Sequence, residues 1–292
     1  MNEFTIRDLE NLSGIKAHTP RIWEQRYSLF KPRRTSTNIR TYTSEDLRML
    51  LNVALLNKAG FRISQIVRMQ KEELYEKVLS LTGFEAYQEK LLNDMVLCMV
   101  ELDAAGFEEK IEQFIRVKGF DQAIKRLVFS FLERIGLLWM TSHINVAQEH
   151  LVTQAIRQKL IAAIDKTPAT KEKLLQVLMF MPEGEVHELG MLYVHYLLRA
   201  AGVSVLYLGS NLPVNDLAYA VKTANPQKIY THITCLPGKN DLPEFFKSFQ
   251  ELLPGKELYL SGSLNGFPPQ KLPPNILFKR SVNEVIDSLS FV

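Results

Sequence analysis

Cysteine is scarce in this chain: its 292 residues contain only two, Cys98 and Cys235, which lie far apart. Two distant cysteines form neither a disulfide framework nor a metal-ligand spacing, which favours a reducing, cytoplasmic setting. No apolar run is long enough to span a bilayer, and the N-terminus lacks the basic patch and apolar stretch of a signal peptide. We therefore expect no membrane partner, and the length predicts two or three domains.

Positive charge is concentrated at the N-terminal end. Residues 1–70 hold 12 lysines and arginines against 6 acidic residues, whereas the rest of the chain holds 23 against 26. A basic end on a slightly acidic body indicates a polyanion partner for that end alone. A solvated basic face is the other interpretation, and charge by itself does not decide between them.

The basic end is predicted to begin with two short helices. Thr5 stands three residues before Asp8, the spacing of a capping box, and Gly14 ends the first helix. Thr19 and Pro20 suit the N-cap and the first position of the second helix.

A basic loop and a third helix follow. The loop runs from Lys31-Pro32-Arg33-Arg34 to Arg40-Thr41-Tyr42, and Thr43 or Ser44 caps a helix over residues 45–58. Gly60 stops that helix, and a further short helix begins at Ser64. Small domains in this order place one helix in the major groove of DNA and one loop on the phosphates.

Exposed residues near the start of the second helix are expected to reach base edges, and the arginines of the loop to pair with phosphates. Ile22 and Trp23 are expected to be partly structural. The predicted DNA-contacting residues are Lys16, His18, Thr19, Arg21, Arg26, Tyr27, Arg33, Arg34, Arg40 and Tyr42.

Four motifs in this end are family-like: Arg21-Ile22-Trp23-Glu24-Gln25-Arg26-Tyr27, Lys31-Pro32-Arg33-Arg34, Arg40-Thr41-Tyr42-Thr43-Ser44-Glu45-Asp46-Leu47 and Ala59-Gly60-Phe61-Arg62-Ile63-Ser64-Gln65-Ile66. Together they make residues 4–68 resemble the winged-helix head of the MerR family of transcriptional regulators. The wing tip departs from the family, which often has Gly-Gly-Tyr-Arg where this chain has Thr37-Asn38-Ile39-Arg40. The resemblance implies a dimer that binds double-stranded promoter DNA; a protein-binding winged helix is the alternative.

Residues 72–166 show no strand-like alternation, and their apolar periodicity predicts helices over 84–102, 106–117, 120–142 and 146–165. Short loops favour an antiparallel four-helix bundle. Trp139 closes the third helix, and Glu149-His150 opens the fourth. Each feature alone is more often core packing or an exposed pair at a helix start.

After residue 167 the pattern changes to strands alternating with helices. The predicted strands are 174–180, 203–208, 228–234, 258–260 and 276–278, and the predicted helices are 187–201, 214–223, 242–253 and 282–289. This alternation predicts a doubly wound, flavodoxin-like sheet of five parallel strands, with a ligand crevice at the carboxyl ends of the strands.

One loop at that edge carries candidate chemistry. His187 follows the first strand, and Glu185, two residues before it, could orient the imidazole through its second nitrogen. Gly190 leaves room for something bulky against the helix. A lone histidine at a helix start is more often a solvated or capping residue. It is the pairing of His187 with Glu185 that indicates a metal-ligating histidine.

The order Trp139, nine residues, Glu149-His150 and then Glu185-x-His187-x-x-Gly190 resembles the CarH/LitR class of MerR regulators, which bind cobalamin. By this resemblance His187 would coordinate cobalt from below, and Trp139, Glu149 and His150 would lie above the corrin. Adenosylcobalamin is the form that the resemblance implies. Its binding would assemble dimers of dimers that repress, and light would break the cobalt–carbon bond.

Several positions depart from that class. Glu185 replaces Asp, Thr234-Cys235-Leu236 replaces Ser-x-Leu, and Gly262-Ser263 replaces Gly-Gly. Met140 stands where the best-known light-sensing members of the class have a histidine that caps cobalt after photolysis, and His143 lies one turn later. A thioether is a soft, weak ligand, so these changes leave open a regulator whose pocket is empty or holds another ligand.

The sequence thus predicts three domains: a winged helix-turn-helix at 1–72, a four-helix cap at 73–166 and a Rossmann-like cobalamin-binding domain at 167–292. It predicts a transcriptional regulator and not an enzyme. The enzyme alternative, a corrinoid methyl carrier, has no need of the basic head.

Overall fold

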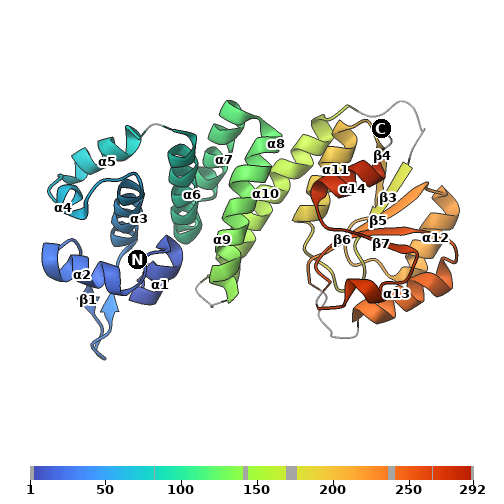
Figure 1. Cartoon of the computed structure of the whole chain (residues 1–292), viewed down its shortest axis with the longest axis horizontal. Coiled ribbons are helices and arrows are strands. Elements are labelled where there is room, and N and C mark those ends of the chain that lie inside the picture. Colours follow the sequence, from blue (N-terminus) through green and yellow to red (C-terminus); the bar gives the residue numbers. More distant parts are fainter. Residues whose placement is uncertain are drawn as a thin grey trace. The chain divides into compact units, whose positions relative to one another are not determined.

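The computed structural model describes residues 3–81, 83–140, 144–168, 176–235, 241–264 and 266–290. The chain forms two compact units, Met1–Ile156 and Arg157–Val292, and each is described by itself (Figure 1). None of the helices described in these ranges combines the length and the apolar character needed to cross a membrane.

The first unit begins with a small helical head closed by a two-stranded wing. Its elements are α1 (Ile6–Ser13), α2 (His18–Tyr27), β1 (Arg33–Arg34), β2 (Arg40–Thr41), α3 (Ser44–Lys58), α4 (Ile63–Ile66) and α5 (Lys71–Leu79). The predicted capping box forms between Thr5 and Asp8, and Thr43, one of the two predicted caps of α3, forms a second box with Asp46. The buried residues Leu47, Leu50 and Leu51 on α3 form the core of the head.

One local prediction for the head is wrong, and one of its helices was not predicted. The second helix begins at His18, and its N-cap, Ala17, has helical backbone angles, so Thr19 lies inside the first turn instead of capping it. Helix α5 was not predicted, because its sequence, KEELYEKVL, shows only two buried positions, Leu74 and Val78. A helix with so narrow an apolar face gives little periodic signal.

A helical region completes the first unit. Its elements are α6 (Phe84–Glu101), α7 (Ala104–Lys118), α8 (Phe120–Gln122), the π-helical turn η1 (Ala123–Val128), α9 (Phe129–Met140) and α10 (Val146–Lys166), which continues into the second unit. These bounds confirm the four predicted helices within a few residues. The π turn inside the third one was not foreseen, since apolar periodicity does not reveal a single wide turn.

The second unit is the predicted α/β domain. Its elements are β3 (Gln176–Phe180), α11 (Leu189–Ala200), β4 (Ser204–Tyr207), α12 (Val214–Ala224), β5 (Lys228–Ile233), α13 (Asp241–Leu252), β6 (Leu258–Gly262), the 3-10 turn η2 (Pro269–Lys271), β7 (Ile276–Lys279) and α14 (Val282–Leu289). All strand pairs are parallel, in the order β4-β3-β5-β6-β7. This is the doubly wound, flavodoxin-like order, so the predicted fold is confirmed.

Side chains of β3 alternate between two cores. Val177 and Met179 pack with residues of α11 and α14, whereas Leu178 and Phe180 pack with residues of α12 and α13. The two helix pairs therefore cover opposite faces of the sheet (Figure 1). With both faces covered, the carboxyl edge of the strands remains as the place for a ligand.

Gly262 at the end of β6 has a backbone reason to be glycine. Its φ is +98°, and a Cβ there would lie 2.0 Å from the carbonyl oxygen of Ile233 on β5. We expect Gly262→Ala to lower the free energy of unfolding by roughly 3 kcal/mol or more, because backbone strain adds to a clash between two paired strands.

Gly266→Ala is the matched control for this prediction. Gly266 also has a positive φ, +81°, but a Cβ there would meet nothing within 4 Å. Its loss should stay at about 1–2 kcal/mol, the cost of the left-handed backbone alone. Urea unfolding followed by circular dichroism compares the two, and equal losses would contradict the clash.

Candidate functional site

The head exposes most of the predicted DNA-contacting side chains. Thr19 is half-buried, and the start of α2 carries two exposed groups, His18 and Arg21. The exposed members of the predicted set are Lys16, His18, Arg21, Arg26, Tyr27, Arg33 and Arg34. These seven form the accessible part of the candidate nucleic-acid interface.

Arg40 and Tyr42, two predicted contact residues that are not fully exposed, bond to the same acid, Glu24. Arg40 Nε donates to Glu24 Oε1 at 3.1 Å, and the Tyr42 hydroxyl donates to Glu24 Oε2 at 3.3 Å. Tyr42 is 1% exposed, and burial, with the nearby Glu24 charge, raises its pKa to about 12. The structure therefore places Tyr42 in the core of the head. Glu24, which was not predicted, fixes the wing to α2.

The turn at the wing tip contains an asparagine, Asn38. Asn38 has a φ of +63°, a conformation that asparagine tolerates better than most residues. Its Oδ1 accepts from Arg34 Nη1 at 2.6 Å. The turn is thus closed without glycine, and Arg34 is held on the exposed wing.

In the second unit, Glu185 is the centre of the candidate site. Its carboxylate is fully buried. Oε1 accepts from the backbone N–H of His187 at 2.8 Å, and Oε2 accepts from the N–H groups of Thr234 and Cys235 at 2.6 and 2.8 Å. Burial alone raises the pKa of this group, but the hydrogen bonds from His187, Cys235 and Thr234 outweigh it and hold the pKa at about 2. Glu185 is therefore an ionised group that joins the loop after β3 to the end of β5.

His187 is bonded to the same carboxylate. Its Nδ1 lies 2.8 Å from Glu185 Oε1, and its side chain is 55% exposed. An ionised carboxylate can only accept, so Nδ1 carries the proton and Nε2 has the lone pair when the ring is neutral. A carboxylate–imidazole pair of this kind orients the ring of a metal-ligating histidine. The contact between Glu185 and His187 that the sequence suggested is present in the structure.

The space beside Gly190 is taken by a side chain of this chain. A Cβ on Gly190 would lie 2.7 Å from Nε2 of His232. His232 Nδ1 lies 2.8 Å from the Ser261 hydroxyl, which lies 2.7 Å from the Tyr230 hydroxyl. Burial lowers the pKa of His232. The bulky group next to Gly190 is thus an imidazole of β5, a residue that the sequence reasoning missed.

The other predicted residues of this edge have mixed placements. Thr234 is exposed and contributes its backbone N–H to Glu185. Gly262 is required by the close approach of β5, and the Ser263 N–H donates to the Ile233 carbonyl at 2.6 Å. Leu236 lies outside the described residues.

On the helical side, only part of the predicted set is described. Trp139 and Met140 belong to the last turn of α9, with no description of their side chains, and His143 lies outside the described residues. Glu149 Oε1 accepts from Thr153 Oγ1 at 2.9 Å, and Glu149 Oε2 lies 3.5 Å from His150 Nε2. Both groups stand at the start of α10, as predicted.

A second acid beside His187 was not predicted. Glu188 is the N-cap residue of α11, where its Oε1 accepts from Arg157 Nε and its Oε2 accepts from the Tyr207 hydroxyl at 3.2 Å. The sequence alone does not show that Glu185 and Glu188, on either side of His187, have different partners. The contacts tie α10 and β4 to the residue that follows His187.

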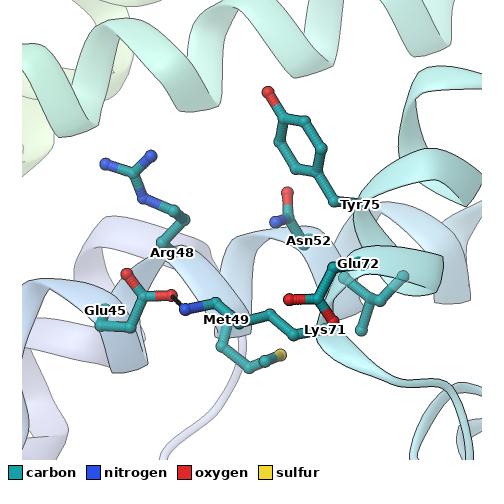
Figure 2. Close-up of a pocket in the computed structure, with 8 residues that line it drawn as sticks. Glu45, Arg48, Met49, Asn52, Lys71, Glu72 and Tyr75 are labelled. Atoms are coloured by element: carbon teal, nitrogen blue, oxygen red, sulfur yellow. Dashed lines mark ion pairs between the residues drawn. The ribbon is translucent and has the colours of Figure 1, made fainter.

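The head also has an open hollow of about 350 Å³ between α3 and α5 (Figure 2). Glu45 and Lys71 form an ion pair of 2.6 Å across it, and Tyr75 stands at its far side. Its lining residues are Glu45, Arg48, Met49, Asn52, Lys71, Glu72, Leu74 and Tyr75. It contains none of the predicted site residues.

Two regions of the chain match known protein families. Residues 4–73 match the family described as MerR HTH family regulatory protein, and residues 91–163 match the B12 binding domain. The second match falls on the helical region and not on the sheet.

Two transcriptional repressors and one corrinoid protein are similar to this chain. The chain is 27% identical over 271 residues to the HTH-type transcriptional repressor CarH of Myxococcus xanthus, covering 89% of each protein. It is 25% identical over 229 residues to the repressor CarA of the same organism, covering 77% of this chain and 74% of CarA. The monomethylamine corrinoid protein of Methanosarcina barkeri matches 70% of this chain and 98% of its own, with a TM-score of 0.56 and 14% identity, a likeness of fold alone.

Proposed function

We propose that this chain is a repressor whose affinity for promoter DNA is set by a bound cobalamin, because residues 4–73 match the MerR HTH family and residues 91–163 match the B12 binding domain. The observation that carries the sensing half is the buried Glu185 carboxylate bonded to Nδ1 of a half-exposed His187. The basic head carries the DNA-binding half.

The residues at the carboxyl edge of the sheet fit the cobalt centre of a cobalamin. An imidazole whose Nδ1 is fixed by a carboxylate has the donor chemistry of a metal ligand. His187 Nε2 would therefore hold cobalt, and Glu185 would orient the imidazole ring. Gly190 offers no further space, since the ring of His232 lies there. When bound, cobalamin would supply a cobalt centre whose upper ligand differs between its chemical forms and with light.

The helical region would supply the other contacts of the cofactor. We propose Trp139, Glu149 and His150 for the upper side, by resemblance to the CarH/LitR class, with Met140 or His143 available after photolysis. The domain limits 1–72, 73–166 and 167–292 belong to this proposal. So do adenosylcobalamin as the bound form, the dimer-to-tetramer change and light control.

An absorbance titration of the full chain tests the proposal. Adenosyl-, methyl- and hydroxocobalamin are added in the dark, and the protein is then separated from unbound cofactor and exposed to green light. We expect a coloured complex with one corrinoid per chain. On illumination we expect the mass of the protein assembly and its affinity for DNA to change. A chain that binds DNA selected from a random pool but stays colourless with all three forms contradicts the sensing half.

A second candidate function is a DNA-binding regulator that binds no cobalamin. The observation that favours it is the imidazole of His232 against Gly190, together with the changed residues Thr234 and Ser263. It predicts the same DNA binding, with no visible absorbance under any of the three conditions.

A further inference from the structure

One arginine of the helical region reaches into the DNA-binding head. Arg134 in α9 donates from Nη2 to the backbone carbonyl of Leu12 in α1 at 2.5 Å, and from Nη1 to Asn93 Oδ1 in α6 at 3.0 Å. Its side chain is 19% exposed, and Asn93 is buried. A single guanidinium therefore joins three helices, one of which belongs to the head.

The Leu12 carbonyl is a position where a cation matters. It is one of the last four carbonyls of α1, which have no partner within the helix and lie at the negative end of its dipole. A planar guanidinium can serve this carbonyl and a second acceptor at once, which a lysine ammonium does less well. If the guanidinium is lost, two mostly buried oxygens lose their donor.

The charge of Arg134 is balanced by an acid that also contacts the head. Glu89 Oε1 on α6 lies 3.6 Å from Arg134 Nη1, and Glu89 Oε2 lies 3.0 Å from Lys58 Nζ in the last turn of α3. The same polar cluster, Arg134, Asn93, Glu89 and Lys58, thus contacts the ends of both α1 and α3.

The end of α1 is firmly tied to the start of α2. The Glu10 carboxylate accepts from the Ala17 N–H at 2.9 Å and pairs with Lys16 Nζ at 3.3 Å. The Gly14 N–H donates to the Glu10 carbonyl at 2.8 Å. Because these bonds fix the turn to α1, a shift of the end of α1 carries with it the start of α2.

We infer that Arg134 is the positioning residue through which the cobalamin-binding region sets the placement of α2 on DNA. The inference rests on the proposed function. Arg134 lies five residues before Trp139 in the same helix, so a displacement of α9 as a rigid helix would also move the guanidinium. The bond to Leu12 passes the change to α1 and from there to α2.

The test compares the full chain with its Arg134→Met variant by hydrogen–deuterium exchange, with and without hydroxocobalamin and adenosylcobalamin. In the parent chain we expect cobalamin to change exchange at residues 6–27. In Arg134→Met we expect a visible spectrum and a cobalamin Kd within threefold of the parent chain, with the change at 6–27 reduced at least fivefold. Lys125→Met, which removes an exposed cation of the same stretch paired with Asp121, should respond as the parent does.

The outcomes separate the inference from a purely structural role. A structural role would raise exchange at 6–27 equally with and without cobalamin, and the difference between the two would persist, which overturns the inference. A parent chain that binds cobalamin without any change at 6–27 also overturns it. A parent chain that shows no cobalamin spectrum removes the proposed function and this inference with it.

Arg134→Lys guards against simple loss of folding in the methionine variant. Lysine keeps the charge but serves the two acceptors less well, so we expect the cobalamin-dependent change at 6–27 to fall between those of the parent chain and Arg134→Met. A full response in a folded Arg134→Lys protein, together with a full response in Arg134→Met, would show that the guanidinium transmits nothing.

Discussion

Replacing His187 with alanine is expected to weaken cobalamin binding by roughly 100-fold or more and to shift the visible spectrum. Loss of an outer group that orients a metal ligand already costs about 10- to 100-fold, and here the ligand itself is removed. The spectrum changes because the lower ligand of cobalt changes from an imidazole nitrogen to another donor or water. An absorbance titration with hydroxocobalamin measures both effects.

Two comparisons make this result specific. Added imidazole should restore the parent spectrum in His187→Ala, because the missing side chain leaves a place beside Glu185 for a free imidazole. His18→Ala, which removes an exposed histidine from the head, should bind cobalamin as the parent chain does. An unchanged Kd and spectrum in His187→Ala would show that this imidazole holds no cobalt.

Replacing both Arg33 and Arg34 with alanine is expected to weaken binding to DNA of any sequence. Each phosphate contact contributes about 0.9 to the slope of log K against log salt, so the slope should fall by about 1.8 per bound chain. At about 0.15 M salt this corresponds to roughly a 30-fold loss of affinity. Both side chains are exposed on the wing, so the folded head should persist.

The control for the wing removes the same charge elsewhere. Lys222 and Lys247 lie exposed on α12 and α13 of the second unit, so a double alanine variant changes net charge equally. It should leave the salt slope and affinity close to those of the parent. A loss that depends on DNA sequence in the wing variant would instead assign base contacts to Arg33 or Arg34.

Periodicity and capping predicted most of the fold, because they are local properties. The capping box at Thr5, the cap at Thr43 and the apolar run 174–180, which contains β3, are read directly from neighbouring residues. The start of α2 was misplaced because Thr19 has the chemistry of a cap, whereas the backbone of Ala17 already has helical angles. At this helix the tight turn before α2, and not the capping preference of threonine, determines where the helix begins.

The candidate site was predicted where its residues are neighbours in sequence and missed where they are not. Glu185 and His187 are two residues apart, and their pairing was foreseen. The two backbone N–H groups that hold Glu185 come from Thr234 and Cys235, and the ring against Gly190 comes from His232. Those contacts depend on strand register, which the sequence does not specify at the level of single atoms.

The π turn at Ala123–Val128 determines how the residues of α9, which follows it, are rotated about the helix axis. Such a turn holds one residue more than an α-helical turn, and one residue corresponds to about 100° of rotation. Deleting a single residue there would convert the wide turn to a regular one while leaving the preceding and following segments helical. The direction in which Arg134 and the backbone at Trp139 face therefore depends on one inserted residue. Substitutions elsewhere in the helix could not produce the same rotation.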